Sequence, residues 1–332
     1  MTKNGLPRIG IHLLNAPDIA AYAIPPARLR QRLAKLVREH RLALEITESR
    51  DAAAVTPAMR EATALVGFNL PAARIQEIPR LRWIHLISAG VDHLLPLTWL
   101  PRSVRMTNSS GVHSELAGEY ACCALLMINI GMPRHAFNQR VGHWDQVFNS
   151  PIRGKTVVLI GVGAIGGAVA MHAKRLGLQV LGVRRSGRQH RYVDEMFTPR
   201  DLRKILPRAD FVVVTAALTD ETRGIVGAKE LDALRPGAGV VNMARAALVD
   251  YEALSRKLET GELRGAVIDV CDPEPLPPDS RLWRVKDLLI TPHVSSDPTD
   301  YVDRTMAIVE DNLRRLVTGR RLRNQVDPRW GY

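Results

Sequence analysis

A glycine-spaced turn near the middle of the chain constrains the fold more than any other feature. It is formed by Thr156-Val-Val-Leu-Ile-Gly-Val-Gly-Ala-Ile-Gly166, an apolar run that predicts a buried parallel strand leading directly into a helix. In such a turn, Gly161 allows the tight reversal and Gly163 lets the backbone approach a pyrophosphate closely. Gly166 lets the new helix pack against its strand. The spacing therefore predicts a dinucleotide site.

The residues that follow give this motif its context. Ala164 and Ile165 begin a predicted helix over 164–176, which ends at Gly177. A second apolar run at 178–183 completes a βαβ unit. The pyrophosphate would lie at the helix N-terminus, where free backbone N–H groups and the positive end of the helix dipole favour an anion.

Strands and helices alternate along the rest of the chain. Strands are predicted at 8–14, 64–67, 81–86, 211–215, 239–242, 265–270 and 287–290, and a strand followed by a loop at 104–112. Helices are predicted at 26–41, 114–130, 228–234, 251–260 and 301–318. This alternation predicts a doubly wound α/β fold with mostly parallel sheets, and the first hundred residues form a second, smaller α/β unit. The helix at 114–130 is too apolar to face solvent, so we expect it to cross between domains or to be covered by another subunit.

Length and composition narrow the class of protein. The 332 residues suffice for two domains, and 46% apolar with 24% charged residues is ordinary for a globular protein. No apolar run reaches the ~20 residues that span a bilayer. The first 13 residues carry no cleavage site of a signal peptide, so the sequence predicts a cytoplasmic protein without membrane contact. Cys122, Cys123 and Cys271 have neither disulfide nor zinc spacing, and no metal is predicted.

The net charge of +12 indicates anionic partners. Nucleic acid is one candidate, but the basic residues are dispersed, aromatic residues are only 5%, and no nucleic-acid-binding motif occurs. A dinucleotide and a carboxylate substrate account for the charge better. We therefore predict small-molecule ligands and no nucleic acid.

Three polar residues, Arg245, Glu274 and His293, come after successive predicted strands. A histidine titrates near neutral pH, and a neighbouring carboxylate favours its protonated form, so that it can pass a proton to a carbonyl oxygen as hydride reaches the carbon. An arginine holds a carboxylate by a two-point fork. Each residue alone has an ordinary structural explanation, but together they form a minimal site for reducing a 2-keto acid.

These residues lie in segments that resemble the D-isomer-specific 2-hydroxyacid dehydrogenase family. Residues 241–250 are similar to the family segment with the catalytic arginine, which implies that role for Arg245. Residues 268–275 resemble the segment with the catalytic glutamate and imply that role for Glu274. Residues 291–295 resemble the segment with the catalytic histidine and imply it for His293. The resemblance runs over most of the chain.

The resemblance implies further contacts. Ser88-Ala-Gly-Val91 is similar to the loop whose backbone N–H groups hold the substrate carboxylate, so Ala89 and Gly90 would act there beside Arg245 and His293. Asp269 would bond the nicotinamide carboxamide; alternatively, it caps a loop. Other residues that the resemblance places along the cofactor are Thr215, Ala216, Ala217, Met243, Ala244 and Ser295.

The family architecture implies two Rossmann-like domains with the active site in the cleft between them. A flavodoxin-like substrate domain would comprise residues 1–107 and 302–332, and a dinucleotide-binding domain residues 108–301. The long helix at 114–130 would form a homodimer contact. Two departures stand out: Ala246 replaces a glycine common after the arginine, and a proline common in the loop at 215–219 is missing.

The residues after the second strand of the βαβ unit bear on the cofactor. An enzyme that uses NAD normally has an acid there, which bonds the ribose 2′-hydroxyl. This chain instead has Arg184, Arg185, Ser186 and Arg188, and its first acidic residue after Gly166 is Asp194. Guanidinium groups and a hydroxyl suit a 2′-phosphate. We predict NADP as the preferred cofactor and NAD as a poorer one.

The sequence thus predicts an NADPH-dependent reductase of small 2-keto acids, such as glyoxylate or hydroxypyruvate, that forms D-2-hydroxy acids. Alternatives are a non-catalytic dinucleotide sensor or corepressor and a formate- or phosphite-type dehydrogenase on the same fold. Residues 15–24, Phe68 and Trp144 are candidates for pocket walls. The side chain of the physiological substrate is not encoded in such spacing.

Overall fold

The computed structural model describes residues 6–15, 21–51 and 54–331. They divide into two compact units, which we call unit 1 and unit 2. Unit 1 comprises Met1–Val112 and Pro298–Tyr332, and unit 2 comprises His113–Asp297. Unit 1 is therefore built from both ends of the chain.

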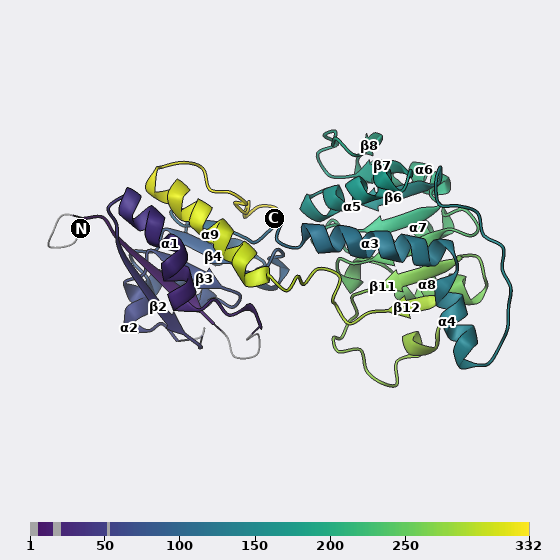
Figure 1. Ribbon diagram of the computed structural model, residues 1–332, viewed down its shortest axis with the longest axis horizontal. Coiled ribbons are helices and arrows are strands. Elements are labelled where there is room, and N and C mark those ends of the chain that lie inside the picture. The colour runs from purple at the N-terminus through teal and green to yellow at the C-terminus, as the bar shows by residue number, and fades with distance from the viewer. Residues whose placement is uncertain (1–5, 16–20, 52–53, 332) are drawn as a thin grey trace. The chain divides into compact units, whose positions relative to one another are not determined.

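Unit 1 contains a five-stranded parallel sheet in the order β2-β1-β3-β4-β5. Its strands are β1 (Arg8–Leu14), β2 (Ala43–Ser49), β3 (Ala64–Gly67), β4 (Trp83–Leu86) and β5 (Arg105–Thr107). Its α-helices are α1 (Pro26–Glu39), α2 (Pro57–Arg60) and α9 (Tyr301–Val317). Figure 1 shows α9 (yellow) beside α1 (purple), although they come from opposite ends of the sequence. The strand order is that of a flavodoxin-like doubly wound sheet.

Two apolar clusters cover the two faces of this sheet. Because side chains alternate along a strand, Ala64 and Val66 of β3 join one cluster and Leu65 joins the other. The first cluster also receives the apolar stripes of α1 and α9, whose members follow helical spacing: Leu29, Leu33, Leu36, Met306, Val309 and Leu313. The C-terminal helix is thus part of the core of the N-terminal unit.

A buried histidine lies within the sheet of unit 1. His85 in β4 has no exposed surface, and its Nδ1 is 2.9 Å from Thr107 Oγ1. Trp83 Nε1 donates to the same hydroxyl at 2.8 Å, and Ser109 Oγ lies 3.3 Å from His85 Nε2. Burial lowers the pKa of His85 from 6.5 to about 3.

We expect this histidine to make the protein acid-sensitive. Folded His85 stays neutral while the unfolded chain takes up a proton below pH 6.5, so stability is lost progressively as the pH falls from 6.5 towards about 3. The free energy of unfolding falls by up to about 1.4 kcal/mol per pH unit. Urea unfolding measures the free energy of unfolding of the wild type and of His85→Gln at each pH. Between about pH 7.5 and about pH 5, this free energy should fall by ~2 kcal/mol more in the wild type than in the variant. Equal losses would contradict this assignment, since buried His12 is common to both proteins.

Unit 2 contains a seven-stranded parallel sheet in the order β12-β11-β10-β9-β6-β7-β8. Its strands are β6 (Thr156–Ile160), β7 (Gln179–Val183), β8 (Glu195–Phe197), β9 (Phe211–Val214), β10 (Gly239–Asn242), β11 (Gly265–Ile268) and β12 (Leu288–Ile290). Its α-helices are α3 (Ser114–Asn129), α4 (Met132–Arg140), α5 (Ala164–Arg175), α6 (Leu202–Ile205), α7 (Ala228–Asp232) and α8 (Tyr251–Glu259). The order reverses between β6 and β9, which is where doubly wound sheets bind dinucleotides.

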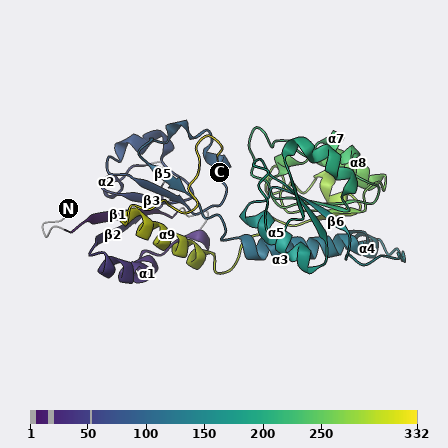
Figure 2. The same cartoon turned by 90° about the horizontal axis from the view of Figure 1, so that it is seen from above.

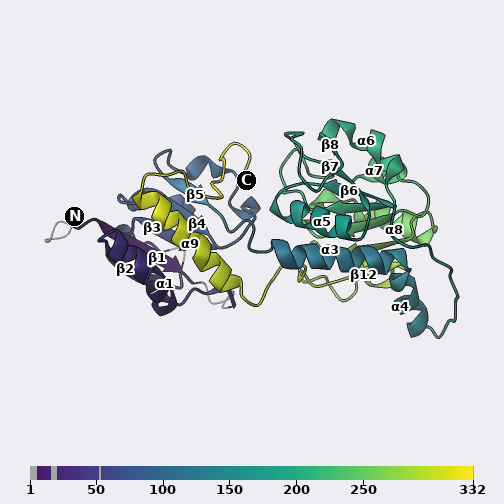
Figure 3. The same ribbon diagram turned by 45° about the horizontal axis from the view of Figure 1, so that its top comes forward.

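Helices cover both faces of this sheet. Figure 2 shows α3 and α5 on one face and α7 and α8 on the other, and the two apolar clusters of unit 2 divide in the same way. The helix α3 runs beside α5 in the view of Figure 3 as well. The predicted doubly wound α/β fold with parallel sheets is confirmed.

The packing of α3 explains its apolar sequence. We expected this helix to cross between domains or to be covered by another subunit. Ala117, Ala121, Leu125 and Ile128 instead pack into the core of unit 2, where they cover the sheet beside α5. Contact of the remaining residues of α3 with another subunit stays a prediction. Among the described residues no single helix could span a membrane by length and hydropathy; only α3 and α4 taken together pass that test, and they are bent by 67°.

Candidate active site

The glycine turn lies between β6 and α5, at the point where the strand order reverses. Gly161 has a φ of 102°, and a Cβ there would be 2.4 Å from the backbone nitrogen of Ala216. A Cβ on Gly166 would be 2.0 Å from the carbonyl oxygen of Gly161. Both positions therefore require glycine. Thr215 Oγ1 donates to the same carbonyl at 2.6 Å, so the loop after β9 lies against the turn.

The start of α5 is open, as a pyrophosphate site requires. Apart from the adjoining residues of the chain, no described atom lies within 4 Å of a Cβ placed on Gly163, and no side chain caps this helix. Ala164 and Ile165 form its first turn, whose backbone N–H groups have no partner inside a helix. The twelve-residue helix therefore presents a bare, positively polarised end, which fits a dinucleotide.

The arginine-rich loop follows β7. The guanidinium group of Arg184 donates to the backbone oxygens of Val162, Arg188 and Gln189 and so ties the glycine turn to this loop. Arg185 and Arg188 are exposed. Ser186 is exposed as well, so the loop presents three polar side chains at the surface.

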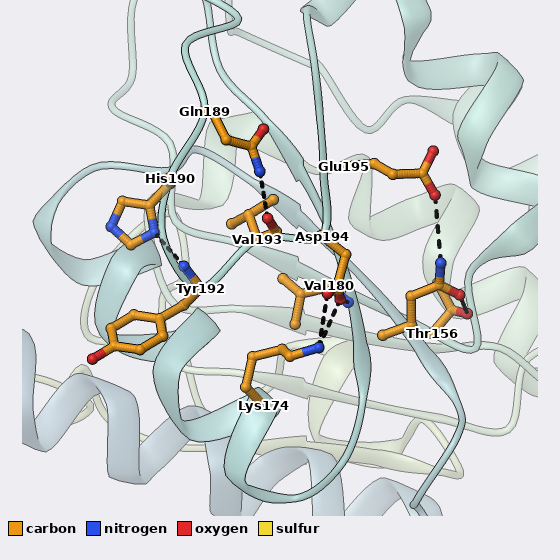
Figure 4. Close-up of polar contacts among 10 residues, drawn as sticks. Thr156, Lys174, Val180, Gln189, His190, Tyr192, Val193, Asp194 and Glu195 are labelled. Carbon is orange, nitrogen blue, oxygen red and sulfur yellow. Dashed lines mark hydrogen bonds and ion pairs between the residues drawn. The ribbon is translucent and has the colours of Figure 1, made fainter.

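Asp194, the first acidic residue after the glycines, is held by other parts of unit 2. Its carboxylate accepts from Lys174 Nζ at 2.8 Å and from the backbone nitrogen of Val180 at 2.7 Å (Figure 4). The loop before it is fastened by a bond from Gln189 Nε2 to the carbonyl oxygen of Val193. This carboxylate is therefore committed to an ion pair and a strand nitrogen.

The predicted catalytic arginine follows β10. The side chain of Asn242, fully buried, accepts from the backbone nitrogen of Ala244 at 3.2 Å and donates to the carbonyl oxygen of Arg245 at 3.0 Å. This fixes the backbone over Met243 to Arg245. Ala246 begins a short 3-10 helix and is not among the residues with positive φ, so alanine causes no strain where the family has glycine.

The predicted catalytic histidine and glutamate form a direct pair. His293 Nδ1 lies 2.8 Å from Glu274 Oε2, and the other carboxylate oxygen of Glu274 accepts from the backbone nitrogen of Cys271 at 2.8 Å. A carboxylate can only accept, so Nδ1 carries the proton of this bond and Nε2 is left to face a substrate. The side chains are 42% and 38% exposed, which leaves the pair accessible.

Asp269 at the end of β11 is buried beneath the histidine loop. Its Oδ1 accepts from Thr291 Oγ1 at 2.5 Å and from the backbone nitrogen of Val294 at 2.9 Å. Its Oδ2 accepts from the backbone nitrogen of Ser295 at 2.9 Å. A carboxylate has about four acceptor positions, so loop capping leaves room for one further donor such as a carboxamide.

Two residues that the sequence analysis missed lie at this site. His113, at the start of unit 2, donates from Nδ1 to the carbonyl oxygen of Ser296. Burial is the main cause of its lowered pKa, and the nearby charges of His293 and Arg245 lower it further. Tyr120 in α3 places its hydroxyl 2.6 Å from Thr291 Oγ1. No local motif marks either residue.

Unit 1 carries the predicted carboxylate loop at the end of β4. Asn108 Nδ2 donates to the carbonyl oxygen of Ala89 at 2.6 Å, and Ser88 Oγ donates to that of Gly90 at 2.7 Å. Phe68 stacks on His93 with ring centroids 4.3 Å apart. Trp144, in unit 2, is 94% exposed, and residues 16–20 of the other candidate pocket wall lie outside the described residues.

Unit 2 thus brings together Arg245, Glu274 and His293, which follow the neighbouring strands β10, β11 and β12 of one sheet. Ala89 and Gly90 belong to unit 1. The same carboxyl edge of the unit 2 sheet carries the glycine turn and the loop after β9. The glycine turn and the His293–Glu274 pair therefore share one edge, which is the usual ligand-binding edge of such sheets.

Comparisons with known proteins agree with this geometry. A family model described as D-isomer specific 2-hydroxyacid dehydrogenase, NAD binding domain, matches residues 123–295. An uncharacterized protein of Streptomyces coelicolor is 39% identical over 69% of this chain and 82% of its own length. Glyoxylate/hydroxypyruvate reductase B of Shigella boydii is 28% identical over 94% of this chain and 98% of its own.

A solved structure is similar over nearly the whole chain. It is a D-isomer specific 2-hydroxyacid dehydrogenase from Xanthobacter autotrophicus in complex with NADPH and MES, with a TM-score of 0.82 and 30% identity, and the match covers 97% of this chain and 99% of that one. These findings confirm the resemblance and the predicted class of NAD(P)-dependent oxidoreductase. The chain belongs to the D-isomer specific 2-hydroxyacid dehydrogenase family.

Proposed function

We propose that this protein reduces small 2-keto acids of the glyoxylate and hydroxypyruvate type to D-2-hydroxy acids. The observation that carries the proposal is the His293–Glu274 pair at 2.8 Å on the sheet edge that also bears the glycine turn. The relative from Shigella boydii is named a glyoxylate/hydroxypyruvate reductase, which supports this substrate class.

His293 is the general acid of the proposed reaction. Glu274 accepts a hydrogen bond from the Nδ1–H group and so orients the imidazole. Nε2, which carries the second proton of the charged imidazole, is then directed at the carbonyl oxygen of the substrate. Arg245 holds the substrate carboxylate with its guanidinium fork and polarises the adjacent carbonyl. The backbone N–H groups of Ala89 and Gly90 are the proposed second contact to that carboxylate.

The glycine turn, the first turn of α5 and the loop after β9 are proposed to hold the dinucleotide. When bound, NADPH supplies the hydride that reaches C2 of the keto acid. The residues proposed to contact it are Gly161, Gly163, Ala164, Ile165, Gly166, Thr215, Ala216, Ala217, Met243, Ala244, Asp269 and Ser295. Asp269 accepts three hydrogen bonds from the histidine loop, and the carboxamide is proposed to donate to its remaining acceptor position.

A preference for NADP over NAD follows from the charges after β7. Arg185, Ser186 and Arg188 are exposed donors for a 2′-phosphate, and Arg184 holds their loop against the glycine turn. Asp194 is occupied by Lys174, so its carboxylate is not free to bond a ribose 2′-hydroxyl. The similar structure from Xanthobacter autotrophicus contains NADPH, which supports the same preference.

We further propose that residues 1–107 with 302–332 serve as the substrate domain and residues 108–301 as the dinucleotide-binding domain. The protein would work in the cytoplasm. The match of the NAD binding domain to residues 123–295 supports the assignment of the second domain.

A homodimer is proposed from an apolar surface on unit 2. Several large apolar side chains are exposed along the end of α3, α4 and the segment after it: Leu126, Ile130, Met132, Val141, Trp144, Val147 and Phe148. Trp144 is 94% and Phe148 89% exposed. Exposure of so many large apolar side chains to water is unfavourable, and their burial between two copies of the chain removes this exposure.

The homodimer proposal predicts the behaviour of a double variant. In analytical ultracentrifugation the wild type should sediment as a dimer. Replacement of both Trp144 and Phe148 by Ser should shift the equilibrium to monomers at micromolar concentration. Trp283→Ser is the matched control, since Trp283 is 48% exposed elsewhere in unit 2 and should leave the dimer intact. A monomeric wild type would overturn the proposal.

Initial rates test the function; they are measured from the fall in absorbance as the reduced nicotinamide is oxidised. Glyoxylate, hydroxypyruvate, pyruvate and a bulky aryl keto acid would each be tried with NADPH and with NADH. We expect turnover of the two small acids with NADPH well above NADH. Oxidation of formate or phosphite without keto-acid reduction, or NADPH binding without turnover of any substrate, would replace the proposal with a formate- or phosphite-type dehydrogenase or a dinucleotide sensor.

A further inference from the structure

His293 has an unusual backbone conformation for a residue with a side chain. Its φ is 54°, in the left-handed region that residues other than glycine rarely adopt. Its own backbone nitrogen donates to the carbonyl oxygens of Asp269 at 2.9 Å and Thr291 at 3.1 Å. Strain of this kind persists only where the surroundings enforce it. The surroundings of this loop therefore matter for where the imidazole points.

The buried carboxylate of Asp269 holds the loop on both sides of His293. Thr291, two residues before the histidine, donates to Oδ1 at 2.5 Å. Val294 and Ser295, directly after it, donate from their backbone nitrogens to Oδ1 and Oδ2, each at 2.9 Å. A buried carboxylate needs such donors, and a loop bound at three points has little freedom to turn.

A tyrosine from a distant helix completes this arrangement. The Thr291 hydroxyl donates its proton to Asp269, so the Tyr120 hydroxyl at 2.6 Å must be the donor to Thr291. Burial raises the pKa of Tyr120 to about 12, which keeps this proton in place at neutral pH. A chain of hydroxyl groups therefore runs from α3 to the carboxylate beneath the histidine loop.

We propose that Thr291 and Tyr120 are positioning residues for His293. Their hydroxyl groups orient Asp269 so that the loop keeps its left-handed turn, Nδ1 of His293 stays on Glu274, and Nε2 stays aimed at the substrate. This role deepens the proposed reductase function and rests on it for its catalytic meaning. Neither residue contacts the reacting atoms in this scheme, so we expect an effect on the rate of proton transfer rather than on binding of the keto acid.

Three variants test the proposal by kinetics. Thr291→Val keeps the shape and removes the hydroxyl; we expect kcat to fall about 10- to 100-fold, with KM for the keto acid changed less than about threefold. Thr291→Ser restores the hydroxyl and should stay within about threefold of the wild type in kcat. Tyr120→Phe removes only the hydroxyl that donates to Thr291, and its kcat should lie between those of Thr291→Val and Thr291→Ser.

Thr305→Val provides the matched control for the loss of a buried hydroxyl. Thr305 lies in α9 of unit 1, is fully buried, and its hydroxyl has no hydrogen-bond partner among the described residues. Its replacement should leave kcat unchanged. Unchanged kcat in Thr291→Val, or equal losses of kcat in Thr291→Val and Thr291→Ser, would overturn the proposal.

Hydrogen exchange tests the same role without turnover. The backbone N–H groups of Val294 and Ser295 donate to Asp269, so their exchange should be slow in the wild type and in Thr291→Ser, and at least about tenfold faster in Thr291→Val. Unaltered exchange in Thr291→Val would refute the positioning role. If the protein reduced no keto acid but showed this exchange pattern, the reductase function would be refuted. The inference that Thr291 and Tyr120 hold the loop in place would still be supported.

Discussion

Replacement of His293 by alanine is expected to lower kcat for keto-acid reduction about 1000-fold while Kd for NADPH changes by less than about twofold. The imidazole is the proposed proton donor, and its Nδ1 is held by Glu274 at 2.8 Å. Without it, the oxygen that gains negative charge as hydride arrives must take its proton from water. Stopped-flow rates with saturating NADPH and a titration of NADPH fluorescence measure the two quantities.

Companion variants separate the chemistry from the shape of the loop. His293→Asn tolerates the left-handed backbone better than alanine does, so a loss of kcat as large as in His293→Ala would assign the effect to the imidazole. Glu274→Gln keeps the geometry but weakens the orienting bond, and we expect a loss of about 10- to 100-fold. His143→Ala, at an exposed histidine of unit 2, is the control. Parallel loss of NADPH affinity in all His293 variants would identify a structural histidine instead.

Replacement of Arg184 by aspartate is expected to lower the ratio of kcat/KM for NADPH to that for NADH about 100-fold, equivalent to about 2.7 kcal/mol. The change removes the donors that hold the loop to Val162 and Gln189 and places a carboxylate where a 2′-phosphate would be repelled. The same carboxylate can accept from a ribose 2′-hydroxyl, so the efficiency with NADH should fall less or rise.

Two further arginines in the loop make this test specific. Arg188→Gln removes an exposed guanidinium group without touching the Arg184 side chain, and we expect a loss of about tenfold in the same ratio. Arg191 stacks on Tyr192 at 4.5 Å, so Arg191→Gln should leave the ratio unchanged. If the ratio stayed constant in both Arg184→Asp and Arg188→Gln, neither arginine would contribute to the choice of cofactor.

Much of the fold was predictable because its strands are buried and apolar. Runs such as 64–67, 211–214 and 239–242 are covered on both faces, so hydrophobic residues are continuous and the strand boundaries are plain. Five elements were missed. The edge strand β2 is rich in polar residues, β8 has only three half-buried residues, and α4 is short and weakly amphipathic. The helices α2 and α6 have only four residues each, too few to show a helical pattern.

The site was predictable only where its chemistry is local in sequence. The glycine turn and the segments around Arg245, Glu274 and His293 each carry a short motif. Tyr120 and His113 carry none, because their partners Thr291 and Ser296 lie more than 170 positions away and only the packing of α3 brings them close. The sequence likewise could not show that Arg184 is turned onto backbone carbonyls, since side-chain direction depends on the loop it stabilises.

The return of the chain to unit 1 sets an order of events during synthesis. The five strands of that sheet are complete once β5 has been made, but one face lacks Met306, Val309 and Leu313 until α9 emerges. All of unit 2 is translated in between. A nascent chain thus carries an uncovered apolar surface for nearly two hundred residues, and a message that stops before α9 yields a product prone to aggregation rather than a smaller folded protein.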